Sequence, residues 1–353
     1  MGKFMKLSMQ IGYAGGFAES VEQVQALESV GMDIAYVAEA YGYDAVSLMG
    51  YLAAKTSTIQ IASGILPIYT RTPTLLAMTA AGIDDLSEGR AILGLGASGP
   101  QVIEGFHGVS YDAPIGRTRE IIQICRDVWK REAPVEHDGK YYQLPLPADK
   151  GTGLGKPLKI ITHPRRSDIP IHVASLGPKN VQLTAELANG WLPILFHPER
   201  AASVWGEDLA IGAAKRDPAL GEMDVIAGGM LAIGPESEVG GFREFSRSMV
   251  ALYVGGMGAR GKNFYNTLFT RYGYEAEAQE IQDLYLAGKK QEAAAAVPAS
   301  FLEETSLCGE EGYVRERVAQ FAEAGVTILN VSPVARTLDG QKEMIAKVKE
   351  MCS

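Results

Sequence analysis

The chain has 353 residues, of which 46% are hydrophobic and 21% charged, and its formal net charge is −9. This composition is that of a globular protein, and the acidic balance argues against a general nucleic-acid-binding surface. Three widely spaced cysteines, the lack of an apolar run of spanning length and the lack of a signal-peptide pattern exclude a disulfide scaffold, a membrane span and secretion, so we expect a cytoplasmic protein.

The first half of the chain alternates short apolar runs, rich in β-branched residues, with longer amphipathic stretches. This pattern predicts strands joined by helices, and therefore a parallel sheet with helical crossovers. Pro73 suits the first turn of a helix, and Gly31 suits the end of one. The predicted strands are 7–13, 34–37, 58–66 and 91–95, and the predicted helices are 19–30, 44–55, 73–86 and 115–130.

Two segments interrupt the same alternation in the second half. Residues 131–169 predict a long connection rich in Pro, Gly and charge, and residues 235–308 predict a mostly helical insertion before the last strand. The remaining predicted strands are 169–174, 191–196, 224–233 and 326–332, and the helices are 179–189, 199–215, 313–324 and 341–351. Eight such units predict an α/β fold, a single-domain (β/α)8 TIM barrel over residues 1–353. A doubly wound open sheet with a helical subdomain is the alternative.

Glu39 directly follows the second predicted strand. Active sites of (β/α)8 barrels are built by the loops after the strands, so a carboxylate here would point into the barrel mouth. It could accept a hydrogen bond there or exchange a proton. Capping of the next helix, or a solvated position, accounts for Glu39 equally well.

Glycines mark the ends of the third and fourth strands. The segment Ser63-Gly64-Ile65 permits a bulge close to a ligand, although a simple turn is the more common outcome. The fourth strand runs into a glycine-rich loop that includes Ala97, Ser98 and Gly99. The spacing of its glycines does not match a dinucleotide fingerprint, but the loop would let the backbone approach a flat ring.

The segment Leu176-Gly177-Pro178-Lys179-Asn180 leads from the fifth strand through a glycine turn into a helix. The first turn of a helix exposes unpaired N–H groups and the positive end of the helix dipole, so it attracts phosphate. Lys179 would add a positive charge. An ordinary turn with a surface lysine is the alternative.

The sequence carries no pattern for other common chemistries. Its five histidines form no HExxH pair, so we expect no catalytic metal. There is no GxSxG nucleophile elbow, and no cysteine lies in a nucleophile motif.

Several of these segments together resemble the bacterial luciferase-like superfamily. The resemblance rests on Glu39, SGI at 63–65, YTRTP at 69–73, DLSEGR at 85–90 leading into AILGLG, and VASLGP at 173–178, and it covers nearly the whole chain. The segments YVGGMG at 253–258 and NFY at 263–265 are similar to the branch of the superfamily that uses the deazaflavin coenzyme F420.

This resemblance implies a (β/α)8 barrel that binds F420 at its carboxyl-terminal mouth, and it implies a homodimer. Glu39 matches an acidic residue beside the deazaflavin, and Gly64-Ile65, next to Ser63, matches a bulge behind the ring that often contains a cis peptide. Ala97, Ser98 and Gly99 match a loop along the cofactor. Leu176, Gly177, Lys179 and Asn180 match the segment that holds its phosphate-bearing tail.

Two places depart from the resemblance. Ala40 stands where several relatives carry a histidine that transfers protons, and Gly99-Pro100 stands where the sugar-phosphate branch carries a glutamate, so a glucose-6-phosphate reaction is doubtful.

We therefore predict an F420-dependent oxidoreductase that transfers a hydride between the deazaflavin and a small organic substrate, with Glu39 as the catalytic candidate. Tyr13 and Tyr41 would line the substrate side. The alternatives are an FMN-dependent monooxygenase on the same barrel and a non-catalytic deazaflavin-binding protein.

Overall fold

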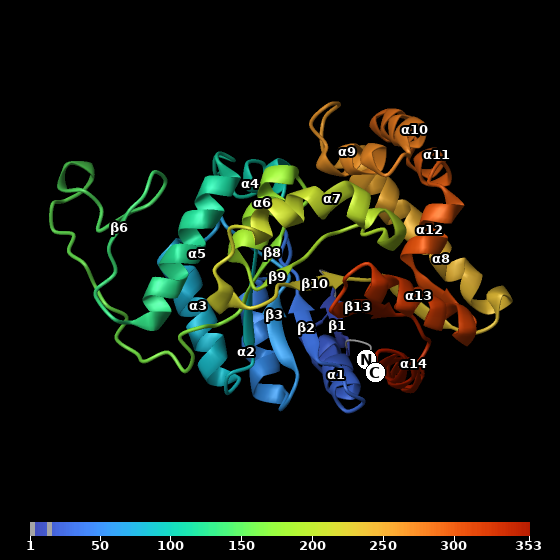
Figure 1. Ribbon diagram of the computed structural model, residues 1–353, viewed down its shortest axis with the longest axis horizontal. Coiled ribbons are helices and arrows are strands. Elements are labelled where there is room, and N and C mark those ends of the chain that lie inside the picture. The colour runs from blue at the N-terminus through green and yellow to red at the C-terminus, as the bar shows by residue number, and fades with distance from the viewer. Residues whose placement is uncertain (1–3, 13–15) are drawn as a thin grey trace.

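The computed structural model describes residues 4–12 and 16–353, and within these residues eight parallel strands form a closed barrel (Figure 1). Their order around the barrel is β1 (Lys6–Ile11), β2 (Ile34–Val37), β3 (Gln60–Ser63), β5 (Ala91–Gly96), β8 (Ile171–Ala174), β9 (Gly190–Trp191), β10 (Asp224–Ala227) and β13 (Ile328–Pro333). The pairing of β1 with β13, in which Lys6 lies opposite Ile328, closes the ring. The predicted (β/α)8 barrel is confirmed, and the open-sheet alternative is wrong.

Helices cover the outside of this barrel. Each lies where an amphipathic stretch predicts it, within three residues at either end, and several begin with proline because the first helical residue needs no N–H partner. The covering helices are α1 (Phe17–Glu28), α2 (Ala45–Lys55), α3 (Pro73–Leu86), α5 (Pro114–Lys130), α6 (Pro178–Leu187), α7 (Pro198–Ala213), α13 (Glu311–Glu323) and α14 (Leu338–Met351). Two single turns, α4 (Pro100–Ile103) and η2 (Pro218–Leu220), lie in connections.

The sixth and seventh strands differ from their predicted bounds. The sixth ends at Trp191 rather than at residue 196, because Phe196 leaves the sheet and stacks on Trp205 of α7, with ring centroids 5.9 Å apart. The seventh is split into β10 and β11 (Met230–Ile233). At the break, a Cβ on Gly228 would lie 2.2 Å from the carbonyl oxygen of Asn330, so the chain passes too close to β13 for a side chain.

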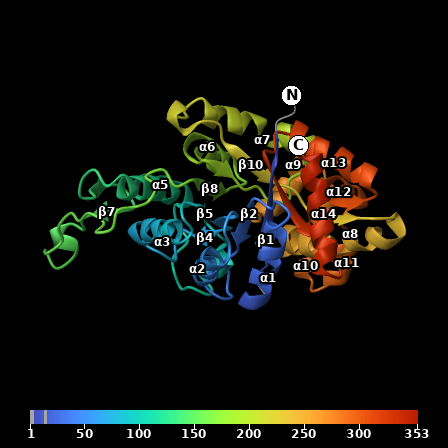
Figure 2. The ribbon, with the colours of Figure 1, turned by 90° about the horizontal axis from the view of Figure 1, so that it is seen from below.

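The long connection 131–169 forms an arm that extends away from the barrel (Figures 1 and 2). It contains an antiparallel ribbon, β6 (His137–Asp138) with β7 (Gln143–Leu144), and the turn η1 (Ala148–Lys150). The buried carboxylate of Glu120 on α5 accepts hydrogen bonds from the N–H groups of Lys140 and Tyr142, at 2.9 and 2.8 Å. Arg166 pairs with the fully buried Asp84 of α3 and so fixes the end of the arm.

The second interruption is helical, as predicted, and lies on the opposite side of the barrel from the arm (Figures 1 and 2). Its elements are α8 (Glu236–Ala251), the π-helical turn η3 (Leu252–Gly256), α9 (Phe264–Arg271), α10 (Glu275–Leu286), α11 (Lys290–Ala295) and α12 (Ala299–Thr305). It returns through β12 (Leu307–Gly309), which pairs with β11, while the short strand β4 (Leu66–Pro67) pairs with β5. No helix of the described residues has the length and apolar character that a membrane crossing requires.

Side chains alternate between the two faces of each barrel strand. On β2, Ala35 and Val37 pack toward the helices, while Ile34 and Tyr36 join a separate cluster inside the barrel. Within this interior the Tyr36 hydroxyl shares a 2.8 Å hydrogen bond with Nδ1 of His172, and both residues are buried. Burial lowers the pKa of His172 to about 3, so the ring is neutral.

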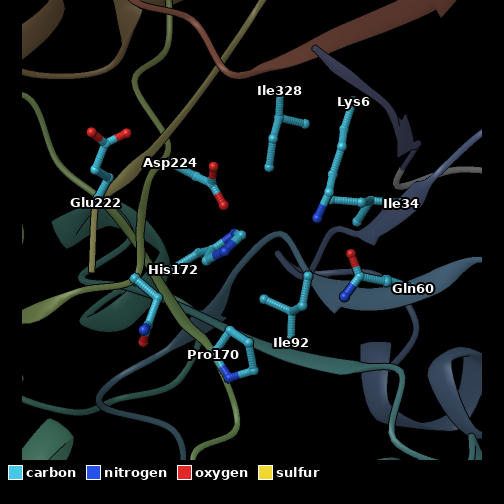
Figure 3. A pocket seen from close by; sticks show the side chains of 10 residues that line it. Lys6, Ile34, Gln60, Ile92, Pro170, His172, Glu222, Asp224 and Ile328 are labelled. Carbon is cyan, nitrogen blue, oxygen red and sulfur yellow. The ribbon is translucent and has the colours of Figure 1, made fainter. Parts of the chain in front are cut away.

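A cavity of about 190 Å³ opens below His172 at the amino ends of the strands (Figure 3). It is lined by strand-start residues, among them Lys6, Gln60 and Asp224, and the His172 ring points into it. This end of a (β/α)8 barrel contributes stability rather than chemistry. The predicted site residues lie at the other end.

The buried neutral histidine predicts acid sensitivity. An unfolded histidine has a pKa near 6.5, so below that pH the unfolded chain binds a proton that folded His172 does not bind, and stability falls as pH falls from about 6.5 toward 3. From pH 7 to pH 5 this group alone should remove about 2 kcal/mol of unfolding free energy.

Urea unfolding at both pH values measures this loss. We expect His172→Asn to reduce the loss by about that amount, and the exposed control His163→Asn to leave it unchanged. An equal loss in wild type and His172→Asn would assign the acid sensitivity to other groups.

Candidate functional site

The predicted site residues meet at the carboxyl ends of four consecutive barrel strands. The strands β2, β3, β5 and β8 are neighbours in the sheet, so their loops form one continuous part of the mouth. Glu39 follows β2, Gly64 follows β3, Ser98 follows β5, and Gly177 follows β8. Tyr13 lies outside the described residues.

Close packing at the end of β3 requires glycine. The peptide between Gly64 and Ile65 is cis, as the family resemblance implies. Gln10 donates a 3.0 Å hydrogen bond to the carbonyl oxygen of Gly64, and a Cβ on Gly64 would lie 2.8 Å from the Cβ of Tyr36. The main chain of β3 is therefore pressed against β2 and held by β1 where it enters the mouth.

Ser63 lies one residue earlier and is fully buried. Its hydroxyl accepts from the N–H of Gly94 and donates to the carbonyl oxygen of Gly94, both at 2.8 Å. A Cβ on Gly94 would lie 1.7 Å from the Ser63 carbonyl oxygen, so the two strands meet through glycine. Both hydrogen bonds of the Ser63 hydroxyl are made to the neighbouring strand β5. Only the main chain of Ser63 is therefore left for a contact with a cofactor.

Glu39 is enclosed by hydrogen-bond donors. Arg71 reaches it with a two-pronged contact, Nη1 to Oε1 at 2.5 Å and Nη2 to Oε2 at 2.9 Å. The N–H of Ala45, the first residue of α2, donates to Oε2 at 3.0 Å. The side chain of Glu39 is only 8% exposed. The capping role that the sequence left open is thus present, and the carboxylate is held in one orientation.

Arg71 joins the loop after β3 to the loop after β2 through two carboxylates. It also donates to Oδ1 of Asp44 at 2.5 Å, and its hydrogen bond to Glu39 raises the pKa of Arg71. Asp44 in turn caps α2 by accepting from the N–H of Ser47. Arg71 lies within the YTRTP segment, but no local pattern in the sequence assigns it a partner.

Tyrosines tie the loop after β3 to the loop after β5. The Tyr69 hydroxyl donates to the carbonyl oxygen of Asp112 at 2.8 Å, and its ring lies 5.2 Å from that of Tyr111. Burial raises the pKa of Tyr69, so the hydroxyl stays protonated. Tyr111 donates to the carbonyl oxygen of Ser98, which has a left-handed backbone with φ of 58°. The side chain of Tyr111 therefore holds the loop that contains Ala97, Ser98 and Gly99.

Two tryptophans hold the segment that precedes α6. Trp191 Nε1 donates to the carbonyl oxygen of Ser175 at 2.9 Å, and Trp205 Nε1 donates to that of Leu176 at 3.0 Å. Both indoles are fully buried. The loop that leads into the helix is therefore set by the packed core behind it.

The start of α6 has the features of an anion site. The N-cap residue is Gly177, so no side chain caps this end of the helix, and the space beside its Cα is open. Within residues 4–12 and 16–353 the main-chain N–H of Lys179 makes no hydrogen bond, and Oδ1 of Asn180 is buried without a partner. Lys179 itself is exposed, with Nζ 3.2 Å from Oε1 of Gln182. The unused N–H group of Lys179 and its ammonium group fit the phosphate of a cofactor tail.

A cluster that the sequence did not predict follows β9. The fully buried His197 has Nε2 2.7 Å from Oε2 of Glu304 and Nδ1 3.2 Å from Oε2 of Glu199. Arg317 of α13 also binds Glu199. These carboxylates lie on two sides of the ring and one already pairs with a guanidinium, so we assign the cluster to joining α7, α12 and α13 rather than to a metal.

Known proteins resemble this chain over nearly its whole length. Residues 4–327 match the sequence model of a family described as luciferase-like monooxygenase. A putative coenzyme F420-dependent oxidoreductase of Mycobacterium tuberculosis is 40% identical over 334 residues, which is 93% of this chain and 95% of that protein. A 5,10-methylenetetrahydromethanopterin reductase of Archaeoglobus fulgidus is 28% identical over 92% of each chain.

Solved structures share the fold. The coenzyme F420-dependent tetrahydromethanopterin reductase from Methanopyrus kandleri superposes with a TM-score of 0.77 over 98% of both chains, at 22% identity. An F420-dependent secondary alcohol dehydrogenase, solved with an F420-acetone adduct, superposes with a TM-score of 0.71 over the whole of both chains, at 16% identity.

The Glu39–Arg71 contact predicts a local stability effect. Glu39→Gln removes the charge that faces the mostly buried Arg71, and it should lower the unfolding free energy by about 1–3 kcal/mol. Asp44→Asn is the matched control, because Asn retains the cap and the lost ion pair is half exposed; we expect it to cost less than about 1 kcal/mol. Denaturant unfolding of both variants checks this order, and equal losses would contradict it.

Proposed function

The chain belongs to the luciferase-like monooxygenase family, and we propose that within it the chain is a coenzyme F420-dependent oxidoreductase that transfers a hydride between the deazaflavin and a small organic substrate. The observation that carries this proposal is the open start of α6, with the unused N–H and the ammonium group of Lys179, at the same end of the barrel as the close-packed strand end at Gly64. The 40% identity to a protein named as F420-dependent supports it.

The residues at the mouth divide into two groups for such a cofactor. Gly177, Lys179 and Asn180 would bind the phosphate-bearing tail through main-chain N–H groups, the ammonium and an amide. The main chain at Gly64-Ile65 and the loop 97–99 would lie along the ring system, and Leu176 would lie between the two groups. When bound, the deazaflavin supplies the hydride chemistry, and the protein orients it and excludes water.

Glu39 has a positioning role in this proposal. Because Arg71 and the N–H of Ala45 occupy its oxygens, a proton exchange at Glu39 would break contacts that hold α2 and the loop after β3. Its carboxylate therefore serves to fix Arg71 and the rim beside the ring. The catalytic role expected from the sequence stays a prediction, and Ala40 brings no ionisable group to this place.

Fluorescence titration of the purified protein with F420, and separately with FMN, tests the cofactor. We expect saturable binding of F420. Lys179→Ala should weaken it about fivefold, by ~1 kcal/mol, because one exposed charge-assisted contact with phosphate is lost. Lys347→Ala, which removes an exposed lysine of α14, is the control and should leave the affinity unchanged.

The outcomes separate the alternatives. Binding of FMN alone, with oxygen consumption by the reduced flavin, would identify an FMN-dependent monooxygenase. Binding of F420 without turnover of ketones, alcohols or activated alkenes would identify a deazaflavin carrier. Unchanged F420 affinity in Lys179→Ala would contradict the phosphate site at α6.

We also propose a homodimer formed through α3. Leu75, Met78 and Leu86 lie on this helix with 45%, 54% and 59% of their surfaces exposed, and Gly82 between them leaves open space. An apolar strip of this kind on a surface helix is typical of a protein interface.

The three cysteines are buried and free, which fits the reducing cytoplasm that we propose as the location of the protein.

Sedimentation velocity tests the dimer. We expect twice the 37.9 kDa chain mass for the wild type, and a monomer for Met78→Glu, because a carboxylate would be buried without a partner at the interface. Glu88→Gln near the end of α3 is a control that keeps the strip. A monomeric wild type at micromolar concentration would contradict the proposal.

A further inference from the structure

Two aromatic side chains stand exposed at the mouth. Tyr41 is 70% exposed and Phe106 is 64% exposed, yet their ring centroids lie only 6.2 Å apart with an interplanar angle of 52°. We call these two residues the ring pair. Large apolar rings that are exposed to water beside a candidate site indicate a binding surface.

The ring pair spans the end of β3. Tyr41 lies on the loop after β2, and Phe106 lies on the loop after β5. The strand between β2 and β5 in the barrel is β3, whose end carries Gly64. A contact between the outer two loops therefore bridges the loop between them, and it places both rings near the main chain that we assign to the cofactor.

Two arginines that hold the loops of the ring pair are already matched. Arg71 binds Glu39 and Asp44, and Arg117 binds both oxygens of Asp112 at 3.0 Å. An ionic group on a substrate would have to displace one of these contacts. The rings are free of such competition, so this part of the mouth favours a neutral, apolar ligand.

A polar group without a partner in the described residues adjoins the ring pair. The His107 ring lies edge-on to Phe106, with centroids 5.2 Å apart and planes at 84°. Its Nε2 is buried and has no hydrogen-bond partner in the described part of the chain. A buried nitrogen without a partner is costly, and an oxygen atom of a ligand would satisfy it.

We propose that the ring pair holds a flat aromatic substrate and that His107 Nε2 binds the one oxygen of this substrate. The substrate class is an aryl ketone or the corresponding aryl carbinol. In the reducing direction the carbonyl carbon gains the hydride, the carbonyl oxygen gains the proton that the reduced deazaflavin releases, through exchange with solvent, and the deazaflavin is oxidised. This inference rests on the proposed function, because the carbonyl carbon must lie beside the deazaflavin.

Equilibrium dialysis tests the substrate class without requiring turnover. The probes are 2-acetonaphthone, cyclohexyl methyl ketone and 2-ethylnaphthalene, which has the shape of the first but lacks its oxygen. With the F420-loaded protein we expect 2-acetonaphthone to bind about tenfold more tightly than cyclohexyl methyl ketone, since stacking on one ring of the pair and an edge contact with the other favour the aromatic probe.

Variants locate the effect. Tyr41→Leu and Phe106→Leu keep an apolar side chain but lose the aromatic face, and each should reduce this preference to about threefold or less. Tyr43→Leu is the matched control, because Tyr43 lies on the same loop with 73% exposure but packs against Phe17 instead. It should retain the full preference.

His107→Leu should weaken the binding of 2-acetonaphthone about fivefold and leave that of 2-ethylnaphthalene unchanged.

Other results would overturn the inference. Equal affinity of the wild type for the aryl and cyclohexyl ketones would exclude an aromatic substrate. A loss of F420 affinity in Tyr41→Leu or Phe106→Leu, with ketone binding intact, would mean that the rings hold the deazaflavin. If the wild type failed to bind F420, the proposed function would fall, while dialysis of the cofactor-free protein would still show whether the ring pair selects an aromatic ring.

Discussion

The pairing of the first strand with the last is the constraint on which the rest of this structure depends. Four residue pairs, from Lys6 with Ile328 to Met9 with Val331, turn a row of parallel strands into a closed ring. Closure gives each of the eight barrel strands a neighbour on both sides, and it brings their carboxyl ends to one mouth. Loops that are far apart in the sequence therefore become neighbours, and each side chain in them faces partners that its own segment does not contain.

The mouth uses these neighbours to hold its loops in place. Arg71 connects the loops after β2 and β3, Tyr69 connects those after β3 and β5, and Trp205 fixes the turn into α6. Each contact joins a charged or polar atom to a main-chain or carboxylate partner from another element. A rim held in this way presents glycine-rich main chain and a helix start in a constant arrangement, which is what binding of a large, flat cofactor requires.

At the same rim, the charged side chains and the exposed aromatic side chains occupy different places. Its charges are paired, Glu39 with Arg71 and Asp112 with Arg117, while Tyr41 and Phe106 are exposed. The anion-binding features lie apart from these rings, at the start of α6. A cofactor with a phosphate tail and a neutral aromatic substrate would therefore meet different parts of one mouth. The polar cavity at the opposite end of the barrel, around His172, takes no part in this division.

The sequence by itself determined the order of the barrel strands and their helices and the four strand ends at which the candidate residues lie, and it favoured a closed (β/α)8 barrel over an open sheet. Local physics was sufficient for this: alternating apolar runs mark strands, Pro73 starts a helix, and glycines mark the strand ends at Gly64 and Gly96. Only the tertiary structure decided that Arg71 encloses Glu39, that Gly228 breaks the seventh strand against β13, and that Phe106 meets Tyr41. Each of these contacts joins loops or strands that are distant in the chain, and their proximity arises from closure of the barrel rather than from any local pattern.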